Sequence, residues 1–487
     1  MSAFISTRSQ KYTADARNAI VNGLAPDGGL YVPIKIPTLD YKTLIGFDYY
    51  VCAARILESW FTDIDASAIE NCCRAAYTHF DTPKVAPVVK AGDTYIVELF
   101  HGETCAFKDV ALSLLPRILV ESKNSLGKKD KVLILSATSG DTGSAAMNGF
   151  KNVPGTGITV FYPDSGVSKI QRKQMVCMEG TNVNACAVRG NFDDCQSGVK
   201  RAFATLEKIP GVSLSSANSI NIARLVPQIA YYYTTYIQMT ASGALKDGEK
   251  LDFIVPTGNF GDILAGYYAK RMGLPIGKLV CASNQNDVLT QFLSEGVYDK
   301  RRSFVRTSSP SMDILISSNL ERLLYHAHGG DCEKVESLMA QLKENGVYSV
   351  DANVLGEIQN DFAAYSCDDA KTRAEIKRFY DSTGYLADPH TAVALHVKER
   401  YLNDNPGHKC AVLSTASPFK FPESVCAALE LNVSGDGFTL LEALSEKTGV
   451  KAPQQLARLK DSQELHTDVI DIADINSYII STQGKLQ

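Results

Sequence analysis

Short, nearly continuous apolar runs recur along the chain after about residue 90. Small or polar residues follow each run, and a segment of helical length comes next. Strands that are apolar on both faces are typical of parallel sheets covered by helices. The pattern therefore predicts buried parallel strands at 131–136, 158–162, 183–188, 253–255, 279–282 and 411–414.

The segments between these runs have the length and composition of helices. We expect helices at 105–121, 141–151, 168–178, 193–209 and 262–272. Repeated βα units of this kind predict an α/β fold with an open, mostly parallel sheet and flanking helices. Ligands bind such sheets at the carboxyl ends of the strands, so the loops that follow the strands are the first candidates for a site.

Two parts of the chain depart from this alternation. Residues 1–90 have helical periodicity and one conspicuous turn, Pro26-Asp27-Gly28-Gly29, and we interpret them as a separate, mostly helical N-terminal domain. Residues 91–487 form the main body. Within it, residues 290–380 are richer in charge and helix formers, which indicates a helical insertion before the last strand.

Composition narrows the class of protein. Of 487 residues, 45% are hydrophobic and 21% are charged, which is close to the average for soluble globular proteins. The net charge of -5, without a dense basic stripe, makes nucleic acid an unexpected partner. No apolar stretch approaches the roughly 20 residues of a spanning helix, and the N-terminus lacks the pattern of a secretory signal. We expect a cytoplasmic protein that does not bind membranes.

The twelve cysteines lie mostly inside apolar segments, and their density is far below that of disulfide-rich domains. We interpret them as reduced, buried thiols. No group of residues has the spacing of a metal site, so no metal is expected.

The first candidate loop follows the predicted strand at 131–136 and reads Thr138-Ser139-Gly140-Asp141-Thr142-Gly143. Small residues let the backbone approach a ligand, hydroxyl groups can donate hydrogen bonds, and the start of the next helix attracts an anion. The loop therefore predicts a site for a carboxylate or a phosphate. The alternative is an ordinary turn in which Asp141 or Thr142 caps the helix.

The second candidate loop, Pro256-Thr257-Gly258-Asn259-Phe260-Gly261-Asp262, can point consecutive backbone N–H groups at an anion. It has neither the lysine of the nucleotide-hydrolase loop nor the three glycines of the dinucleotide fingerprint. Two anion loops in one sheet indicate a ligand with two anionic ends, or a phosphorylated cofactor beside an anionic substrate.

Lys108 lies between aromatic and small residues, in Ala106-Phe107-Lys108-Asp109, at the start of an apolar helix. Burial there would lower the pKa of its amine toward the neutral form used in Schiff-base chemistry. The alternative is a surface lysine with a buried stem. Thr415 offers a hydroxyl at the end of the last predicted strand, and its alternative is a simple turn residue.

Together these parts match the needs of pyridoxal 5'-phosphate. This cofactor carries an aldehyde for a lysine and a phosphate for an anion loop, and it acts on amino acids. Thr415 would then face the nitrogen of its pyridine ring.

Further motifs follow one another in a specific order along almost the whole chain. They are Asp27-Gly28-Gly29-Leu30, Phe100-His101-Gly102, Ala106-Phe107-Lys108-Asp109, Thr138-Ser139-Gly140-Asp141-Thr142-Gly143, Ala217-Asn218-Ser219-Ile220-Asn221 with Arg224-Leu225, Gly258-Asn259-Phe260-Gly261-Asp262, Ala282-Ser283-Asn284-Gln285-Asn286-Asp287, Ser309-Pro310-Ser311-Met312-Asp313, Asp388-Pro389-His390-Thr391-Ala392 and Thr415-Ala416. In this order they resemble the threonine synthase family, pyridoxal-phosphate enzymes of the tryptophan-synthase-β fold group. The N-terminal domain resembles the longer branch of bacteria and fungi.

The resemblance implies fold type II, with two open, twisted, mostly parallel sheets in two α/β subdomains of a catalytic body at 91–487. It implies that Lys108 binds the cofactor covalently and moves protons, and that Thr415 faces the ring nitrogen. The cofactor phosphate is then expected at Gly258, Asn259, Phe260, Gly261 and Asp262, and the substrate carboxylate at Ser139, Gly140, Asp141 and Thr142.

The substrate implied is O-phospho-L-homoserine, which a carbon–oxygen lyase of this family converts with water to L-threonine and phosphate. Its phosphate needs a second anion site, and the guanidinium of an arginine can bind phosphate through two hydrogen bonds. The expected contacts are Asn218, Ser219, Asn221 and Arg224, with Lys169 and Arg172 as weaker candidates. The alternative is a helix start with capping asparagines and an exposed arginine.

Other functions stay open at this point. The same scaffold would serve a phosphohomoserine phospholyase or a serine/threonine dehydratase, and a more distant alternative is a binding protein without activity. Beyond the small-molecule substrate, the resemblance is compatible with a monomer or a homodimer.

Overall fold

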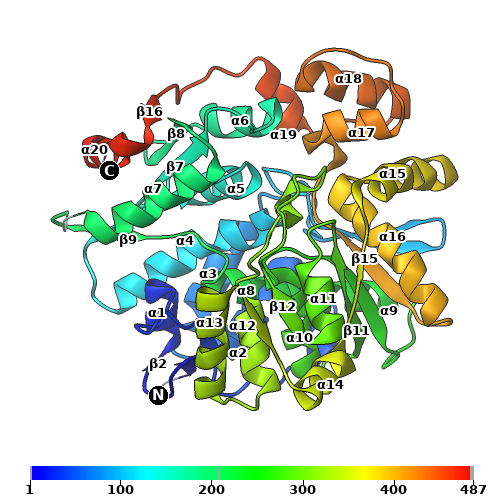
Figure 1. Cartoon of the computed structure of the whole chain (residues 1–487), viewed down its shortest axis with the longest axis horizontal. Helices are drawn as coiled ribbons and strands as arrows, with labels where there is room; N and C mark the ends of the chain where they lie inside the picture. The colour runs from blue at the N-terminus through cyan, green and yellow to red at the C-terminus, as the bar shows by residue number, and fades with distance from the viewer. Residues whose placement is uncertain (1–2, 207–208, 483–487) are drawn as a thin grey trace.

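The computed structural model describes residues 3–206 and 209–482, and it contains two large sheets (Figure 1). The six-stranded sheet has the order β14-β11-β10-β15-β5-β4 and is parallel except for β4. The five-stranded sheet has the order β16-β8-β7-β6-β9 and is parallel throughout. The predicted α/β class with mostly parallel sheets is confirmed.

All the strands predicted from apolar runs are present and almost entirely buried. They are β6 (Lys131–Ala137), β7 (Thr156–Pro163), β8 (Val183–Arg189), β10 (Leu251–Pro256), β11 (Ile276–Ser283) and β15 (Cys410–Ser414). The sheets are completed by β4 (Val88–Ala91), β5 (Thr94–Glu98), β9 (Val212–Ser215), β14 (Phe362–Ser366) and β16 (Val469–Asp471).

The predicted helices are also present. They are α4 (Lys108–Ser125), α5 (Asp141–Phe150), α6 (Lys169–Val176), α7 (Phe192–Thr205) and α10 (Gly261–Arg271). The first begins at Lys108 and not at Cys105, because Cys105 has a φ of 56° and the N–H of Cys105 closes a turn onto the carbonyl of Gly102. This turn places Lys108 at the helix start.

The N-terminal region contains α1 (Ala16–Asn22), α2 (Tyr49–Trp60) and α3 (Ala66–Tyr77), drawn in blue in Figure 1. It also contains a small antiparallel sheet of β1 (Phe4–Ser6), β2 (Thr13–Ala14) and β3 (Tyr31–Pro33). Strands this short show no readable alternation, so the sequence did not predict them. Residue 90 lies inside β4, and the division of the chain at that point stays a prediction.

Residues 290–380 are helical but not purely an insertion. The helices are α11 (Val288–Glu295), α12 (Leu320–Ala327), α13 (Cys332–Asn345), α14 (Ala352–Asp361) and α15 (Asp369–Thr383). Between them, β12 (Val297–Asp299) pairs with β13 (Val347–Ser349), and β14 forms the edge of the six-stranded sheet beside β11. Because β14 has small residues in place of a continuous apolar run, its pattern did not predict a strand.

The C-terminal segment connects the two sheets. The remaining helices are α8 (Ile222–Leu225), α9 (Ile229–Ala241), α16 (Pro389–Asp404), α17 (Pro422–Ala428), α18 (Gly437–Thr448), α19 (Gln454–Ala457) and α20 (Ile475–Thr482). In Figure 1 the chain runs along the top from α17 and α18, in orange, to β16 and α20, in red. This path adds β16 to the five-stranded sheet beside β8.

Within residues 3–206 and 209–482, no helix is long and apolar enough to cross a membrane. The same residues contain all twelve cysteines, and none of them forms a disulfide.

Candidate active site

Four segments that lie far apart in the sequence meet around Lys108. They are the start of α4, the loop between β6 and α5, the loop around Ser311, and the turn that follows β15. The Nζ atom of Lys108 lies 3.2 Å from Ser311 Oγ and 3.7 Å from Asp141 Oδ2. Each of these four segments includes a motif that the sequence singled out.

Lys108 is a buried amine with a side chain only 13% exposed. Burial lowers its pKa, the nearby cations Lys420 and Arg224 lower it further, and Asp141 opposes them without reversing the shift. An amine with a lowered pKa is more often neutral and therefore nucleophilic near neutral pH.

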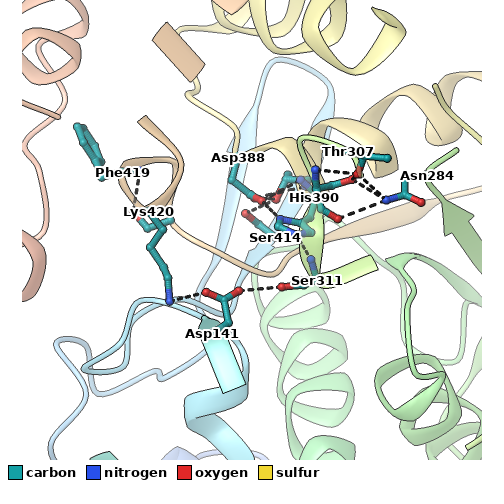
Figure 2. Close-up of polar contacts among 12 residues, drawn as sticks. Asp141, Asn284, Thr307, Ser311, Asp388, His390, Ser414, Phe419 and Lys420 are labelled. Atoms are coloured by element: carbon teal, nitrogen blue, oxygen red, sulfur yellow. Dashed lines mark hydrogen bonds and ion pairs between the residues drawn. The ribbon is translucent and has the colours of Figure 1, made fainter. Parts of the chain in front are cut away.

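Asp141 starts α5 and is the anion of the cluster (Figure 2). Its Oδ1 lies 2.9 Å from Lys420 Nζ and accepts a hydrogen bond from Gln171 at 2.9 Å, while its Oδ2 accepts one from Ser311 at 2.8 Å. Burial favours the neutral acid, but Lys420 and Lys108 outweigh it and hold the pKa of Asp141 well below its ordinary range. A buried carboxylate repels a second carboxylate, so the backbone of this loop is suited to a substrate carboxylate and the side chain of Asp141 is not.

The loop itself is shaped by Thr138 and Gly140. Thr138 Oγ1 accepts hydrogen bonds from the backbone N–H groups of Gly140 at 3.0 Å and Gly143 at 2.9 Å. Gly140 has a φ of 148°, which side chains rarely adopt, so the turn requires glycine there. Ser139 is exposed and Thr142 is half-buried.

The loop 258–262 between β10 and α10 has the form of an anion cradle. In the described residues, none of its backbone N–H groups donates to a protein acceptor. Its carbonyls are occupied instead, because Gly258 O accepts from Ser317 at 2.7 Å and Asn259 O accepts from the Asn319 amide at 3.0 Å. Free donors at a helix start are suited to a phosphate. A Cβ atom at Gly258 would lie 2.7 Å from Ser311 O, so this loop and Lys108 both adjoin Ser311.

Phe260 and Asp262 serve this loop in different ways. Phe260 is buried with a left-handed φ of 61°, which turns the chain into α10. Asp262 Oδ1 accepts hydrogen bonds from the hydroxyls of Tyr231 at 2.5 Å and Tyr232 at 3.0 Å. Asp262 Oδ2 has no partner in the described part of the chain. Asp262 and Gly261 can therefore contribute backbone N–H groups to a phosphate, and the Asp262 carboxylate cannot.

Burial raises the pKa of Asp262 to about 6, which predicts a pH-dependent cost to folding. Because the folded protein binds this proton more tightly than the unfolded chain, stability contributed by the neutral acid is lost as pH rises from about 4 to about 6. One pKa unit corresponds to about 1.4 kcal/mol of stability. The free energy of unfolding of Asp262→Asn minus that of the parent should therefore be about 3 kcal/mol larger above pH 6 than below pH 4. Urea unfolding of the ligand-free proteins across this pH range measures the difference, and parallel pH profiles would contradict it.

Arg224 is a buried cation that pairs with no carboxylate in the described part of the chain. Its side chain lies in α8, the residue is 4% exposed, and burial alone lowers its pKa to about 10. One guanidinium N–H donates to Ala217 O at 2.5 Å, and Nε has no partner in the described residues. A buried, unpaired guanidinium is costly unless an anion binds it.

The neighbouring candidates differ in their availability. Asn218 is exposed and Ser219 half-buried, and the Ser219 hydroxyl donates a hydrogen bond to Asn218 Oδ1 at 3.4 Å. Asn221 caps α8 through Ala223 N–H and donates to Ile20 O at 2.9 Å, so its side chain is engaged in the structure. The alternative interpretation of this segment was a helix start with capping asparagines and an exposed arginine. Asn221 is such a cap, but Arg224 is buried and not exposed.

The weaker candidates Lys169 and Arg172 lie on α6 and pair with carboxylates. Lys169 contacts Asp436 at 2.5 Å, and Arg172 binds Glu464 through two hydrogen bonds of 2.8 and 2.9 Å. These pairs attach α6 to the C-terminal segment, which leaves Arg224 as the available guanidinium among the candidates.

Thr415 is buried directly after β15. Its carbonyl accepts the N–H of Phe107 at 2.8 Å, one residue before Lys108, and its hydroxyl has no protein partner among the described residues. A free hydroxyl beside the lysine is available for a ligand.

Several residues of the site carried no predicted role. Ser311 and His390 belong to quoted motifs: the Ser311 N–H donates to His390 Nε2 at 3.2 Å, and His390 Nδ1 lies 2.7 Å from Asp388 Oδ1 (Figure 2). Arg322 is fully buried and donates to the carbonyls of Tyr31 and Ile220, at 2.9 and 2.6 Å. It thereby links the N-terminal region to the loop before α8.

These residues fit a group with an aldehyde and a phosphate. A buried amine of lowered pKa lies near a cradle of N–H groups and a hydroxyl that have no partner within residues 3–206 and 209–482, and Arg224, whose Nε also has none there, offers a second anion site. Pyridoxal phosphate has the first two functions and takes amino acids with further anionic groups.

Comparison with known proteins agrees with this chemistry. Residues 86–415 match the family model described as pyridoxal-phosphate dependent enzyme, so fold and site define an enzyme that uses pyridoxal phosphate. Residues 3–77 match the model of the threonine synthase N terminus, and residues 391–479 match that of the threonine synthase C-terminal region.

Individual relatives narrow the assignment. The threonine synthase of Saccharomyces cerevisiae is 38% identical over 92% of this chain and 93% of its own length. The threonine synthase of Pseudomonas aeruginosa is 40% identical over 87% of this chain and 89% of its own length. The structure of a PLP-bound threonine synthase from Brucella melitensis superposes with a TM-score of 0.88 at 38% identity, covering 98% of this chain and 99% of that one. The chain belongs to the threonine synthase family.

Proposed function

We propose that the protein converts O-phospho-L-homoserine and water to L-threonine and phosphate, as a carbon–oxygen lyase. The observation that carries this proposal is Arg224, a buried guanidinium whose Nε has no partner among the described residues and whose charge lowers the pKa of Lys108. A dehydratase that acts on serine or threonine has no second phosphate to bind, so it does not require this cation.

Each part of the site has a proposed task. The N–H groups of Gly258, Asn259, Phe260, Gly261 and Asp262 bind the phosphate of the cofactor, and the Thr415 hydroxyl faces its ring nitrogen. The backbone of Ser139, Gly140, Asp141 and Thr142 binds the substrate carboxylate. Arg224, with Asn218 and Ser219, binds the substrate phosphate, and Asn221 supports them by capping α8.

Lys108 moves the protons. When bound, pyridoxal phosphate supplies an electron sink for the charge that develops on the substrate. Lys108 is the residue that would hold the aldehyde of the cofactor, and as a free neutral amine it would take the proton from the substrate Cα. A second proton leaves Cβ as phosphate leaves Cγ, and the same amine then returns a proton to Cγ. Water adds its hydroxyl at Cβ and gives its proton to the released phosphate, and Cα regains its proton. Ser311, at 3.2 Å, orients Lys108 Nζ during these transfers.

The test is a product balance. We expect the purified protein, loaded with pyridoxal phosphate and incubated with O-phospho-L-homoserine, to release phosphate and L-threonine in equal amounts. Phosphate with mainly 2-oxobutyrate would overturn the proposal in favour of a phospholyase. Release of pyruvate from L-serine or of 2-oxobutyrate from L-threonine, with no phosphate from phosphohomoserine, would favour a dehydratase. The last two outcomes differ in substrate, so one experiment separates them.

We also propose a cytoplasmic location and a monomeric or homodimeric state, as predicted from the sequence. Cell fractionation and light scattering on the purified protein test these two proposals.

A further inference from the structure

A second lysine, Lys420, lies in the same buried cluster as Lys108. It ends the short 3-10 helix Pro418–Lys420 after β15, and its side chain is 0% exposed. Its Nζ lies 2.9 Å from Asp141 Oδ1 and donates to Thr104 O at 2.8 Å. Lysine is almost never fully buried unless it is paired. The proposed reaction assigns no task to this pair.

The two lysines share one carboxylate unequally. Asp141 Oδ1 contacts Lys420 directly, whereas Lys108 Nζ is 3.7 Å from Oδ2, beyond an ordinary hydrogen bond. Oδ2 is instead occupied by the hydroxyl of Ser311 at 2.8 Å. Figure 2 shows Asp141 between Lys420 on one side and Ser311 on the other. Lys108 Nζ therefore lies closer to the neutral Ser311 hydroxyl, at 3.2 Å, than to the Asp141 carboxylate.

The other charged groups around Lys108 do not replace this carboxylate. Asp109, next to it on α4, is bonded to the N–H and hydroxyl of Thr104 at 2.8 and 2.7 Å. His390 contacts the cluster through the N–H of Ser311, and Arg224 is a cation, so neither supplies a carboxylate. Burial lowers the pKa of Lys108, and Lys420 and Arg224 add to the effect.

We propose that Lys420 is a positioning residue that occupies the Asp141 carboxylate, so that Lys108 is the amine that loses its proton and captures the cofactor. The inference rests on the proposed role of Lys108 and not on the identity of the substrate. Capture joins Lys108 Nζ to the aldehyde carbon with loss of one water, and only the neutral amine makes this bond. Without Lys420, Asp141 has Lys108 as its nearest lysine and keeps it protonated.

The experiment measures cofactor capture, not turnover. Ligand-free protein is mixed with pyridoxal phosphate over a series of pH values, and the covalent product is followed by absorbance. Borohydride reduction and mass spectrometry then locate the bond. We expect Lys420→Met to raise the apparent pKa of capture by about one unit or more, so that capture below this pKa is about tenfold slower.

Three variants isolate the cause. Lys420→Arg keeps a cation on Asp141 and should retain the parent pH profile. The double variant Lys420→Met with Asp141→Asn removes both charges and should restore the parent pH profile of capture. Lys398→Met is the matched control, because Lys398 is also buried and paired, with Asp93 and Thr94, away from this cluster.

A folded Lys420→Met protein with the parent profile would overturn the inference, and so would an Arg variant that behaves like the Met variant. If circular dichroism shows that Lys420→Met does not fold, Lys420→Gln is judged by the same criterion. Capture by the parent at a lysine other than Lys108 would overturn the role of Lys108 itself. A parent that captures on Lys108 but makes no threonine would overturn only the proposed substrate.

Discussion

Lys108→Ala is expected to abolish covalent capture of pyridoxal phosphate and to lower the rate of threonine formation by about 10³-fold or more. Positioned acid–base groups contribute about 10² to 10⁴-fold, and the proposed reaction uses this amine for every proton transfer. The cradle at 258–262 is intact in the variant, so the cofactor should still bind without a covalent bond. Absorbance spectra and the release of phosphate and threonine measure both effects.

The control for this prediction is Lys398→Ala, another buried and paired lysine, which should keep both properties. Lys420 is the rival amine, since it lies in the same cluster. A borohydride label on Lys420 in the parent protein, or a Lys108→Ala variant with more than about 1% of parental turnover, would contradict the assignment, given the contribution expected of a positioned base.

The sequence pattern predicted the parallel strands because these strands are buried on both faces, whereas their division into two sheets was implied only by the family resemblance. Runs such as that of β6 are apolar almost throughout, and no exposed face interrupts them. The same criterion could not find β14, where only Phe362 is fully buried, or the two- and three-residue strands of the N-terminal sheet. Those strands are defined by hydrogen bonds to distant partners, which a local pattern does not contain.

Only part of the candidate site could be predicted from local sequence. The loops at 138–142 and 258–262 were predictable because glycines and a helix start specify their backbone locally. The ion pair between Lys420 and Asp141 was not, since it joins distant parts of the chain. Lys420 stands between Phe419 and Phe421, as Lys108 follows Phe107, so a buried lysine could have been suspected there. Only the contacts distinguish the reactive amine from the paired one.

The side chain of Asp141 shows the limit of assigning a whole motif to one ligand. The loop was expected to bind a carboxylate, and its small residues and helix start agree with that task. The carboxylate of Asp141, however, is directed at two lysines and Ser311. One loop can therefore combine an anion site on its backbone with an anion of its own, provided that the two face different partners.

Arg224→Met is expected to lower kcat/KM for O-phospho-L-homoserine by about 10² to 10³-fold. Truncating a buried, hydrogen-bonded charge costs 2–5 kcal/mol in comparable pairs, and each 1.4 kcal/mol is tenfold. The affinity for L-threonine, which has no phosphate, should change little. Steady-state kinetics and spectral titration with threonine give the two values. The matched control is Arg172→Met, because Arg172 is already paired with Glu464 and should not affect either value.

The affinity for pyridoxal phosphate decides which phosphate Arg224 binds. Asn319 contacts both Asn259 O and Ser219 O, so the cradle and the loop before α8 are neighbours. If Arg224→Met weakens cofactor binding as much as it weakens catalysis, the guanidinium serves the cofactor and the proposed substrate site is wrong. If only catalysis falls, the second phosphate is its ligand. In that case ligand-free Arg224→Met should be at least as stable as the parent, because the variant no longer buries an unpaired charge.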